Sequence, residues 1–469
     1  MQATSERATG ASVSRHTLGL LIFIHVVACC ASLIFVVEYY RRLLPIAGNS
    51  ITHLQAAALG VIPFSLCAII FAFRRFSFGY AVSFYFFTLI LGYLWLIEFS
   101  TFHYDHRAAA ISAFASGIAF LIPALFLNSP LPRYFVLSAN QLKILLRAIL
   151  LGSIAVLIIG AAFSFQWVDP SEIYNFRNDI MLPRWLNYAI GIASGTLLPF
   201  AYACFVRLRS YAQAALCLLL LLLLYPITLT KLSLLAPGWL LFLTVLSRYF
   251  DGRTATILSL LLPITTGVLI AIGVRYALLP KTLIPAYFST VNFRMIAMPS
   301  SALDFYNDFF SSHELTHFCH VTLVKLFTSC PYKEPLAVLM QDSYHLGFFN
   351  ASLFATEGIA SVGLTLAPLS AFVCGLVISV GNRASSGLPE QFILLSGGLL
   401  LQILMNVPLT ITLVSHGAAL MFLLWYIMPR DVLDQPRVGS APEKQRQTLT
   451  EQKRYPCAYS SSMQTTLAS

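Results

Sequence analysis

Apolar runs long enough to cross a lipid bilayer recur along nearly the whole chain, separated by short polar segments. A helix needs about 20 predominantly apolar residues to span the hydrocarbon core of a membrane. The tightest boundaries between runs lie at 229–234 and 413–414. The predicted spans are 17–37, 53–73, 78–99, 108–127, 144–164, 187–205, 211–229, 234–249, 255–278, 351–380, 391–412 and 414–428. The pattern therefore predicts an all-α polytopic membrane protein with about 12 transmembrane helices.

Composition and charge agree with this class and add an orientation. The 469 residues are 58% hydrophobic and 10% charged, with a mean hydropathy of +0.77, whereas a soluble domain carries about 25% charged residues. If the predicted spans are threaded through the membrane in order, 18 of the 29 Lys and Arg residues fall on the same side of the membrane as the amino terminus. Twelve of them are in the connecting segments and the amino-terminal part, and six are in the tail. Positive charge marks the cytoplasmic side, so both termini are expected there. No basic patch is interleaved with aromatic residues, so nucleic acid is not an expected partner. The apolar runs make the lipid bilayer the expected partner.

Two polar segments are longer than ordinary connections and are expected on the outer face. They are 165–186 and 279–350, and the second is predicted to be partly helical. Long loops of this kind are usually functional. Residues 1–429 are thus expected to form one integral membrane domain, whereas 430–469, rich in Gln, Ser, Pro and basic residues, is expected to be a disordered cytoplasmic tail.

The sequence "SSHELTH" at 311–317 carries the spacing of a zinc metalloprotease, His313-Glu314-x-x-His317. Ser311 and Glu314 also have the spacing of a helix capping box. They predict a helix over 312–327, on which both histidines share one face. A shorter helix is predicted before it, starting after Pro299 with Ser300 or Ser301 as its cap. Zinc proteolysis is therefore one hypothesis for this segment.

A zinc protease needs a third ligand as well. His320 lies on the same predicted helix, where three ligands converge poorly, and no metalloprotease signature surrounds His345 or Glu357. The chain has no Cys-x-x-Cys, which excludes a zinc ribbon. Cys319 and Cys330 share the outer segment and could form a disulfide.

The same polar segments also suit the chemistry of anions and sugars. Arg294, between "VNF" and "MIAMP", has apolar neighbours, so simple exposure explains it poorly. Arginine binds diphosphate through a planar, bidentate fork. Carboxylates and histidines within reach of a hydroxyl can remove its proton. No Asp-x-Asp occurs in the chain, which favours a metal-free donor, with no cofactor, if the protein is a glycosyltransferase.

Three stretches together resemble the Wzy-type oligosaccharide repeat-unit polymerases of bacterial surface polysaccharides. They are "FRMIAMPSSALDFYNDFFSSHELTHFCHV" (293–321), "NASLFATEGIASVGLTLAPLSAFVCGLVISV" (350–380) and "MNVPLTITLVSHGAALMFLLWY" (405–426). The family pattern has an Arg shortly before a Pro, then Tyr-x-Asp-Phe-Phe, and then a stretch like "HxLTYxSH". The matching residues here are Arg294, Pro299, Tyr306, Asp308, Phe309, Phe310, His313, Leu315, Thr316 and His320. His317 stands where an aromatic residue is usual, so we expect it to matter least.

The resemblance implies a membrane glycosyltransferase that polymerises undecaprenyl-diphosphate-linked oligosaccharides at the outer face of the bacterial inner membrane. It implies no metal or cofactor, and it leaves a chain-length regulator open as a partner. In the hypothesis drawn from it, the base that activates the acceptor hydroxyl is His313, His320 or Asp308. Arg294 and Arg177 hold the diphosphate, while Glu172 and Tyr306 are candidates for sugar contact. A transporter of lipid-linked oligosaccharides is the alternative, and the sequence does not separate a polymerase from a related ligase.

Overall fold

The computed structural model describes residues 13–169, 172, 173, 176, 180–321, 324, 327, 329–345 and 351–430. This part of the chain is built of helices and contains no β-strand. The predicted disordered tail, apart from Arg430, and the candidate Arg177 lie outside the described residues.

Within the described ranges, ten helical segments are long and apolar enough to cross a membrane. They are α1 (Arg15–Tyr40), α2 with α3 (Ile51–Leu66, Ile69–Phe73), α4 with η1 (Phe78–Leu96, Ile97–Phe99), α5 (His106–Phe126), α6 (Ala139–Phe163), α8, η2 and α9 (Arg184–Ile192, Ala193–Leu197, Leu198–Arg207), α10 with α11 (Tyr211–Leu223, Tyr225–Thr228), α12 (Lys231–Tyr249), α13 (Gly252–Arg275), and η5 with α16 (Phe354–Ala360, Ser361–Ser385). The bent pair α18 (Leu409–Ser415) and α19 (Ala418–Ile427), at 62°, adds an eleventh. A shorter apolar helix, α17 (Glu390–Asn406), lies before this pair. The all-α polytopic membrane class is confirmed. Ten of the predicted spans correspond to the ten long segments, and the last two correspond to α17 and to the α18–α19 pair, with different ends.

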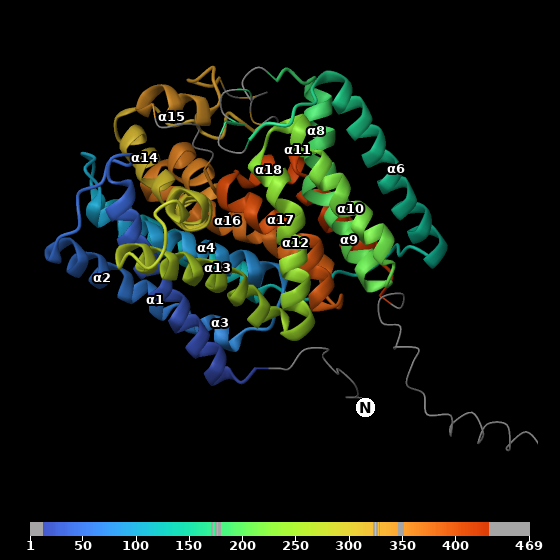
Figure 1. Ribbon diagram of the computed structural model, residues 1–469, viewed down its shortest axis with the longest axis horizontal. Coiled ribbons are helices and arrows are strands. Elements are labelled where there is room, and N and C mark those ends of the chain that lie inside the picture. The colour runs from blue at the N-terminus through green and yellow to red at the C-terminus, as the bar shows by residue number, and fades with distance from the viewer. Residues whose placement is uncertain are drawn as a thin grey trace, which may run out of the picture.

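Helix α4 forms the centre of the bundle (Figure 1). All of its residues are buried, and it packs against α1, α2, α5, α14, α16 and α17. Its sequence, "FGYAVSFYFFTLILGYLWL", carries no charge, so every face can be buried. Peripheral helices such as α6 instead expose large apolar side chains, including Ile144, Leu151 and Ile158. Such a surface suits contact with lipid.

The first half of segment 279–350 is a helix packed inside the bundle. The π-helix η3 (Ile284–Ala297) continues directly into α14 (Met298–Ser312). The predicted helix start after Pro299 is therefore wrong. Ser300 does not cap a helix, because its hydroxyl donates to the Leu89 carbonyl of α4 at 2.9 Å. This bond fixes α14 against the central helix.

The two long polar segments lie at the same end of the molecule. The end of α6, the start of α8, the end of α14 and α15 (Leu336–Tyr344) all lie toward the top of Figure 1, opposite the first described residues. The 165–186 segment is anchored there by the Gln166 amide, which donates to the Pro226 carbonyl at 2.8 Å.

Candidate functional site

Two carboxylates and three tyrosines from four parts of the chain gather at the end of α14. We call Tyr93, Tyr104, Asp304, Asp308 and Tyr344 the carboxylate–tyrosine cluster. The two aspartates are four residues apart on α14, so they lie on one face of that helix. The tyrosines come from α4, from the connection that follows it, and from α15.

The buried half of the cluster is a chain of hydrogen bonds that ends on Asp304. The Asp304 side chain is only 5% exposed and accepts a hydrogen bond from the Tyr104 hydroxyl. The hydroxyls of Tyr104 and Tyr93 are 3.3 Å apart. Asn307 Nδ2 donates to the Tyr93 hydroxyl at 2.7 Å. Because the chain joins α4, α14 and the connection after α4, it fixes the carboxylate in place.

This environment makes Asp304 a group that titrates near neutral pH. Burial raises the pKa of Asp304 to about 7, although hydrogen bonds from Tyr104 and Ser100 lower it, and the neighbouring Asp308 carboxylate adds to the rise. Helix α14 is not among the candidate membrane spans. Removing a carboxylate from water disfavours its charged form, and here that effect exceeds the hydrogen bonds.

The accessible half of the cluster is Asp308. It is half-buried, and its Oδ2 atom accepts a hydrogen bond from the Tyr344 hydroxyl at 2.7 Å. Burial and the nearby carboxylates raise the pKa of Tyr344, so the phenol stays a donor. Its ring packs against Phe102 and Phe305, with centroid distances of 5.4 and 5.0 Å. A carboxylate held in this way can accept a proton from an incoming hydroxyl.

The "HELTH" segment is not helical. Helix α14 ends at Ser312, and His313 has extended backbone angles. The Ser311 hydroxyl donates to the Asp308 carbonyl at 2.7 Å and caps nothing. The predicted capping box and the predicted helix over 312–327 are therefore wrong. We call residues 313–320 the strap.

The strap is hydrogen-bonded to backbone carbonyls beside a break in the neighbouring helix. Gly363 has φ 73° and ψ 174° and interrupts α16. The carbonyls of Ala360 and Ser361 before this break accept hydrogen bonds from the amides of Thr316 and His317, at 2.8 and 3.2 Å. A backbone carbonyl inside a bundle needs a donor. The strap supplies two donors that a continuous α16 would have provided itself.

The zinc-protease geometry is consequently not formed. His317 and Phe318 have left-handed backbone angles, with φ of 46° and 60°. His313 Nδ1 lies 2.8 Å from the Phe309 carbonyl oxygen, and its ring stacks on that of Phe309 with centroids 3.9 Å apart. The two histidines do not share a helical turn, which the zinc hypothesis requires.

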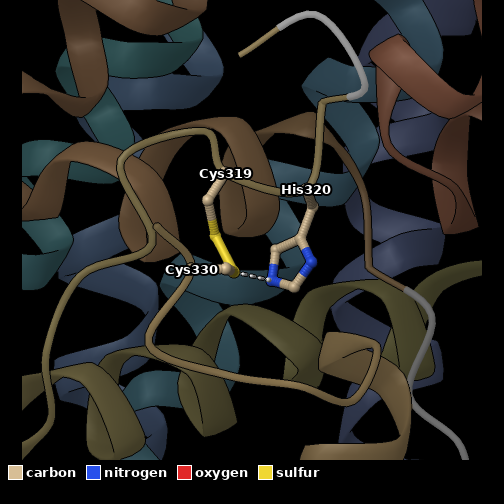
Figure 2. Close-up of side chains that lie close together, drawn as sticks. All are labelled: Cys319, His320 and Cys330. Atoms are coloured by element: carbon tan, nitrogen blue, oxygen red, sulfur yellow. Dashed lines mark hydrogen bonds between the residues drawn. A yellow bond between two sulfur atoms is a disulfide. The ribbon is translucent and has the colours of Figure 1, made fainter. Parts of the chain in front are cut away.

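The strap ends in a disulfide between Cys319 and Cys330, the pairing that the sequence left open. Figure 2 shows the His320 imidazole turned toward this bond, with Nε2 3.9 Å from Cys330 Sγ. Among the described residues, these three side chains are the one group close enough to share a metal ion. Sulfur binds zinc as a thiolate, and sulfurs joined in a disulfide offer none. With the disulfide formed, Cys319, His320 and Cys330 therefore do not fit a metal ion.

The other candidate residues lie away from the cluster or are covered. Arg294 is half-buried in η3, 14 residues before Asp308, which is about 20 Å along a helix axis. Tyr306 is 1% exposed, so no sugar reaches it in this conformation. Glu172 is exposed on the connection between α6 and α8. Of the residues predicted from the sequence, the described structure brings only Asp308 into the cluster.

A third acidic group lies inside the bundle. Glu357 in η5 is 3% exposed, and its Oε1 atom accepts hydrogen bonds from the amide and the hydroxyl of Thr410, at 2.8 and 2.7 Å. These bonds tie η5 to the first turn of α18. Glu357 was a possible zinc ligand on sequence grounds, whereas its hydrogen bonds here are those of an anchor between two broken helices.

Sequence reasoning assigned no role to Asp304 or to the three tyrosines. Tyr104 and Asp304 are 200 residues apart, and aromatic residues near span ends are ordinary in membrane proteins. The spacing of Asp304 and Asp308 at i and i+4 was the one local signal.

No family model, curated protein or solved structure matches this chain.

Proposed function

We propose that this protein is a metal-independent membrane glycosyltransferase that polymerises oligosaccharide units linked to undecaprenyl diphosphate. Three features support the proposal: the resemblance of 293–321, the helical membrane bundle and the carboxylate–tyrosine cluster. The observation that carries most weight is Asp308, a half-buried carboxylate at the end of α14 with one oxygen held by Tyr344 at 2.7 Å.

In the proposed reaction, Asp308 is the base. It takes the proton from the acceptor hydroxyl as that oxygen attacks the anomeric carbon of the donor, and the lipid diphosphate leaves. Tyr344 fixes the carboxylate while leaving its second oxygen for the substrate. His313 and His320 are exposed on the strap and stay candidates for the same role. Arg294 lies too far along the helix to touch the same atoms as Asp308, so its proposed diphosphate contact requires a donor that extends toward η3.

The test is the length distribution of the polysaccharide in cells that depend on this protein. A positioned base contributes typically about 10²–10⁴-fold, so Asp308→Asn is expected to lower polymer yield by about that factor. Single repeat units should still be exported. The control is Asp342→Asn, which removes an exposed carboxylate from α15 and should leave yield unchanged. Normal polymer from Asp308→Asn excludes Asp308 as base, and normal polymer from Arg294→Ala excludes the diphosphate contact.

A transporter of lipid-linked oligosaccharides is the second candidate, and the broken helices favour it. Helix α16 is interrupted at Gly363, α18 and α19 bend by 62°, and the buried Glu357 joins the two regions. Discontinuous helices with buried charged groups are typical of transporter binding sites. Deletion distinguishes the two functions. Loss of a polymerase leaves single units exported, whereas loss of the transporter leaves none.

A further inference from the structure

The direction of the hydrogen bonds around Asp304 can be worked out from the donors alone. A tyrosine hydroxyl has one hydrogen to donate, and that of Tyr104 goes to Asp304. In the contact between the two hydroxyls, Tyr93 must therefore be the donor. Asn307 Nδ2 in turn donates to Tyr93. Every hydrogen in the chain points toward the carboxylate, an arrangement in which each bond strengthens the next.

The far end of the chain lies at a small hollow. Asn307 is 3% exposed, and its Oδ1 atom is buried with no hydrogen-bond partner among the described residues. Asn307 lines a cavity of about 10 Å³ together with Ser112 and Ser116. That volume is about what one water molecule needs. The amide offers both a donor and an acceptor, so after rotation it can serve a chain that runs in the opposite direction.

We infer that the Asp304 carboxylate is a proton-binding site, and that the hydrogen-bond chain between it and Asn307 reverses direction when the proton binds. When the carboxylate takes a proton, the Asp304 hydroxyl becomes the donor to Tyr104. The two tyrosines then reverse their bonds, and the Asn307 carbonyl accepts from Tyr93. One O–H bond forms on Asp304 as one breaks in the hydronium ion or buffer acid that supplies the proton, while the two tyrosine hydroxyls and the Asn307 amide only rotate.

The groups facing Asp304 decide how tightly the proton is held. Tyr104 and Ser100 donate to the carboxylate and favour its charged form, whereas burial and the Asp308 charge favour its neutral form. Tyr93 on α4 lies one hydrogen bond further along the chain, and the Asp304 charge is among the causes that raise the pKa of Tyr344 on α15. Because Asp308 is one turn away, loading Asp304 changes the charge felt by the base. That consequence rests on the proposed function, and proton binding itself does not.

The test is an infrared titration of the purified full-length protein, from about pH 5 to about pH 9, which follows the carbonyl stretch of protonated carboxyl groups. This range lies above the pKa of an ordinary aspartate. As the pH rises, the wild-type protein should lose one band of a protonated carboxyl group, with a midpoint at about pH 7. Asp304→Asn should lack this band, and the exposed-residue control Asp342→Asn should keep it.

Two further variants keep the test decisive if Asp304→Asn does not fold. Tyr104→Phe removes a donor to the charged form and should move the midpoint to higher pH, whereas Asp308→Asn removes a like charge and should move it to lower pH. Tyr134→Phe, which alters an exposed tyrosine, should leave it unchanged. The inference is overturned if no band titrates in the wild type, if the band persists in Asp304→Asn, or if Tyr104→Phe leaves the midpoint in place. No substrate is present, so these outcomes do not bear on the polymer assay.

Discussion

Replacing Cys319 and Cys330 with serine removes the covalent bond that closes the end of the strap. The two cysteines are 11 residues apart in the sequence. In the chain-entropy account, a disulfide closing a loop of this length stabilises the folded state by about 3 kcal/mol. Hydrogen bonds also hold the strap. Two backbone bonds and the contact between the Thr316 and Ser361 hydroxyls, at 3.2 Å, join it to the broken helix, and the Tyr332 hydroxyl donates to the Glu314 carbonyl at 2.7 Å. Each such bond contributes about 1 kcal/mol, so the disulfide is the largest single restraint.

The effect should be local before it is global. The amides of Thr316 and His317 donate to Ala360 and Ser361, so their hydrogen exchange reports whether the strap stays in place. A loss of about 3 kcal/mol corresponds to an increase in the opening equilibrium of up to about 10²-fold. Peptides covering 313–320 should exchange faster by up to this factor, whereas peptides covering the buried helix α4 should not change.

Hydrogen exchange followed by mass spectrometry, with the protein in detergent or nanodiscs, measures this directly. The matched control is Cys67→Ser, which replaces a free, half-buried cysteine and should leave strap exchange unchanged. Reducing the wild-type protein with a dithiol should reproduce the double variant. If strap exchange is the same with and without the disulfide, the hydrogen bonds hold the strap unaided, and the reasoning about its main restraint is wrong.

Two other predictions concern stability. Burial raises the pKa of Asp304 from 3.8 to about 7, so the folded state binds this proton more tightly than the unfolded state. The stabilisation of the folded state by this proton is full below about pH 4 and is lost as the pH rises through about 7. The loss is at most about 4 kcal/mol. The thermal midpoint of the wild type should fall over that range more steeply than that of Asp304→Asn, and equal slopes would contradict the assignment. Gly363→Ala places a side chain at φ 73° and should cost about 1–3 kcal/mol in a denaturant or thermal assay. In the control Gly152→Ala, the added carbon meets nothing within 4 Å on helix α6, so stability should not fall.

The membrane helices could be predicted because their signal is local. A run of apolar residues as long as the bilayer is thick specifies a span without reference to the rest of the chain. Even the short α10–α11 and α12 segments were separated correctly at Thr230, which caps α12 by accepting from the Ser233 amide. The predicted span 391–412 instead ends earlier, at Asn406, because a proline follows shortly after and begins the next element.

The site was less predictable because its members are joined by tertiary contacts alone. Asp308 stood out through a resemblance, but its partner Tyr344 is 36 residues away across the disulfide-closed segment. Asp304 gained its character from burial beside Tyr104, 200 residues away. Charge, spacing and composition indicate which side chains can do chemistry, but burial and partners decide which of them do.

The strap shows why a local helix signal can lose to the surrounding structure. A helix over 312–327 would satisfy its own amides internally and offer none to Ala360 and Ser361. Their carbonyls, stranded before the break at Gly363, would then lack donors, at a cost of about 1–3 kcal/mol each. The non-helical strap supplies both donors. The backbone amides of Thr316 and His317 thus complete the hydrogen bonding of a broken helix. The side-chain spacing of "HELTH", which suggests zinc, plays no part in that contact.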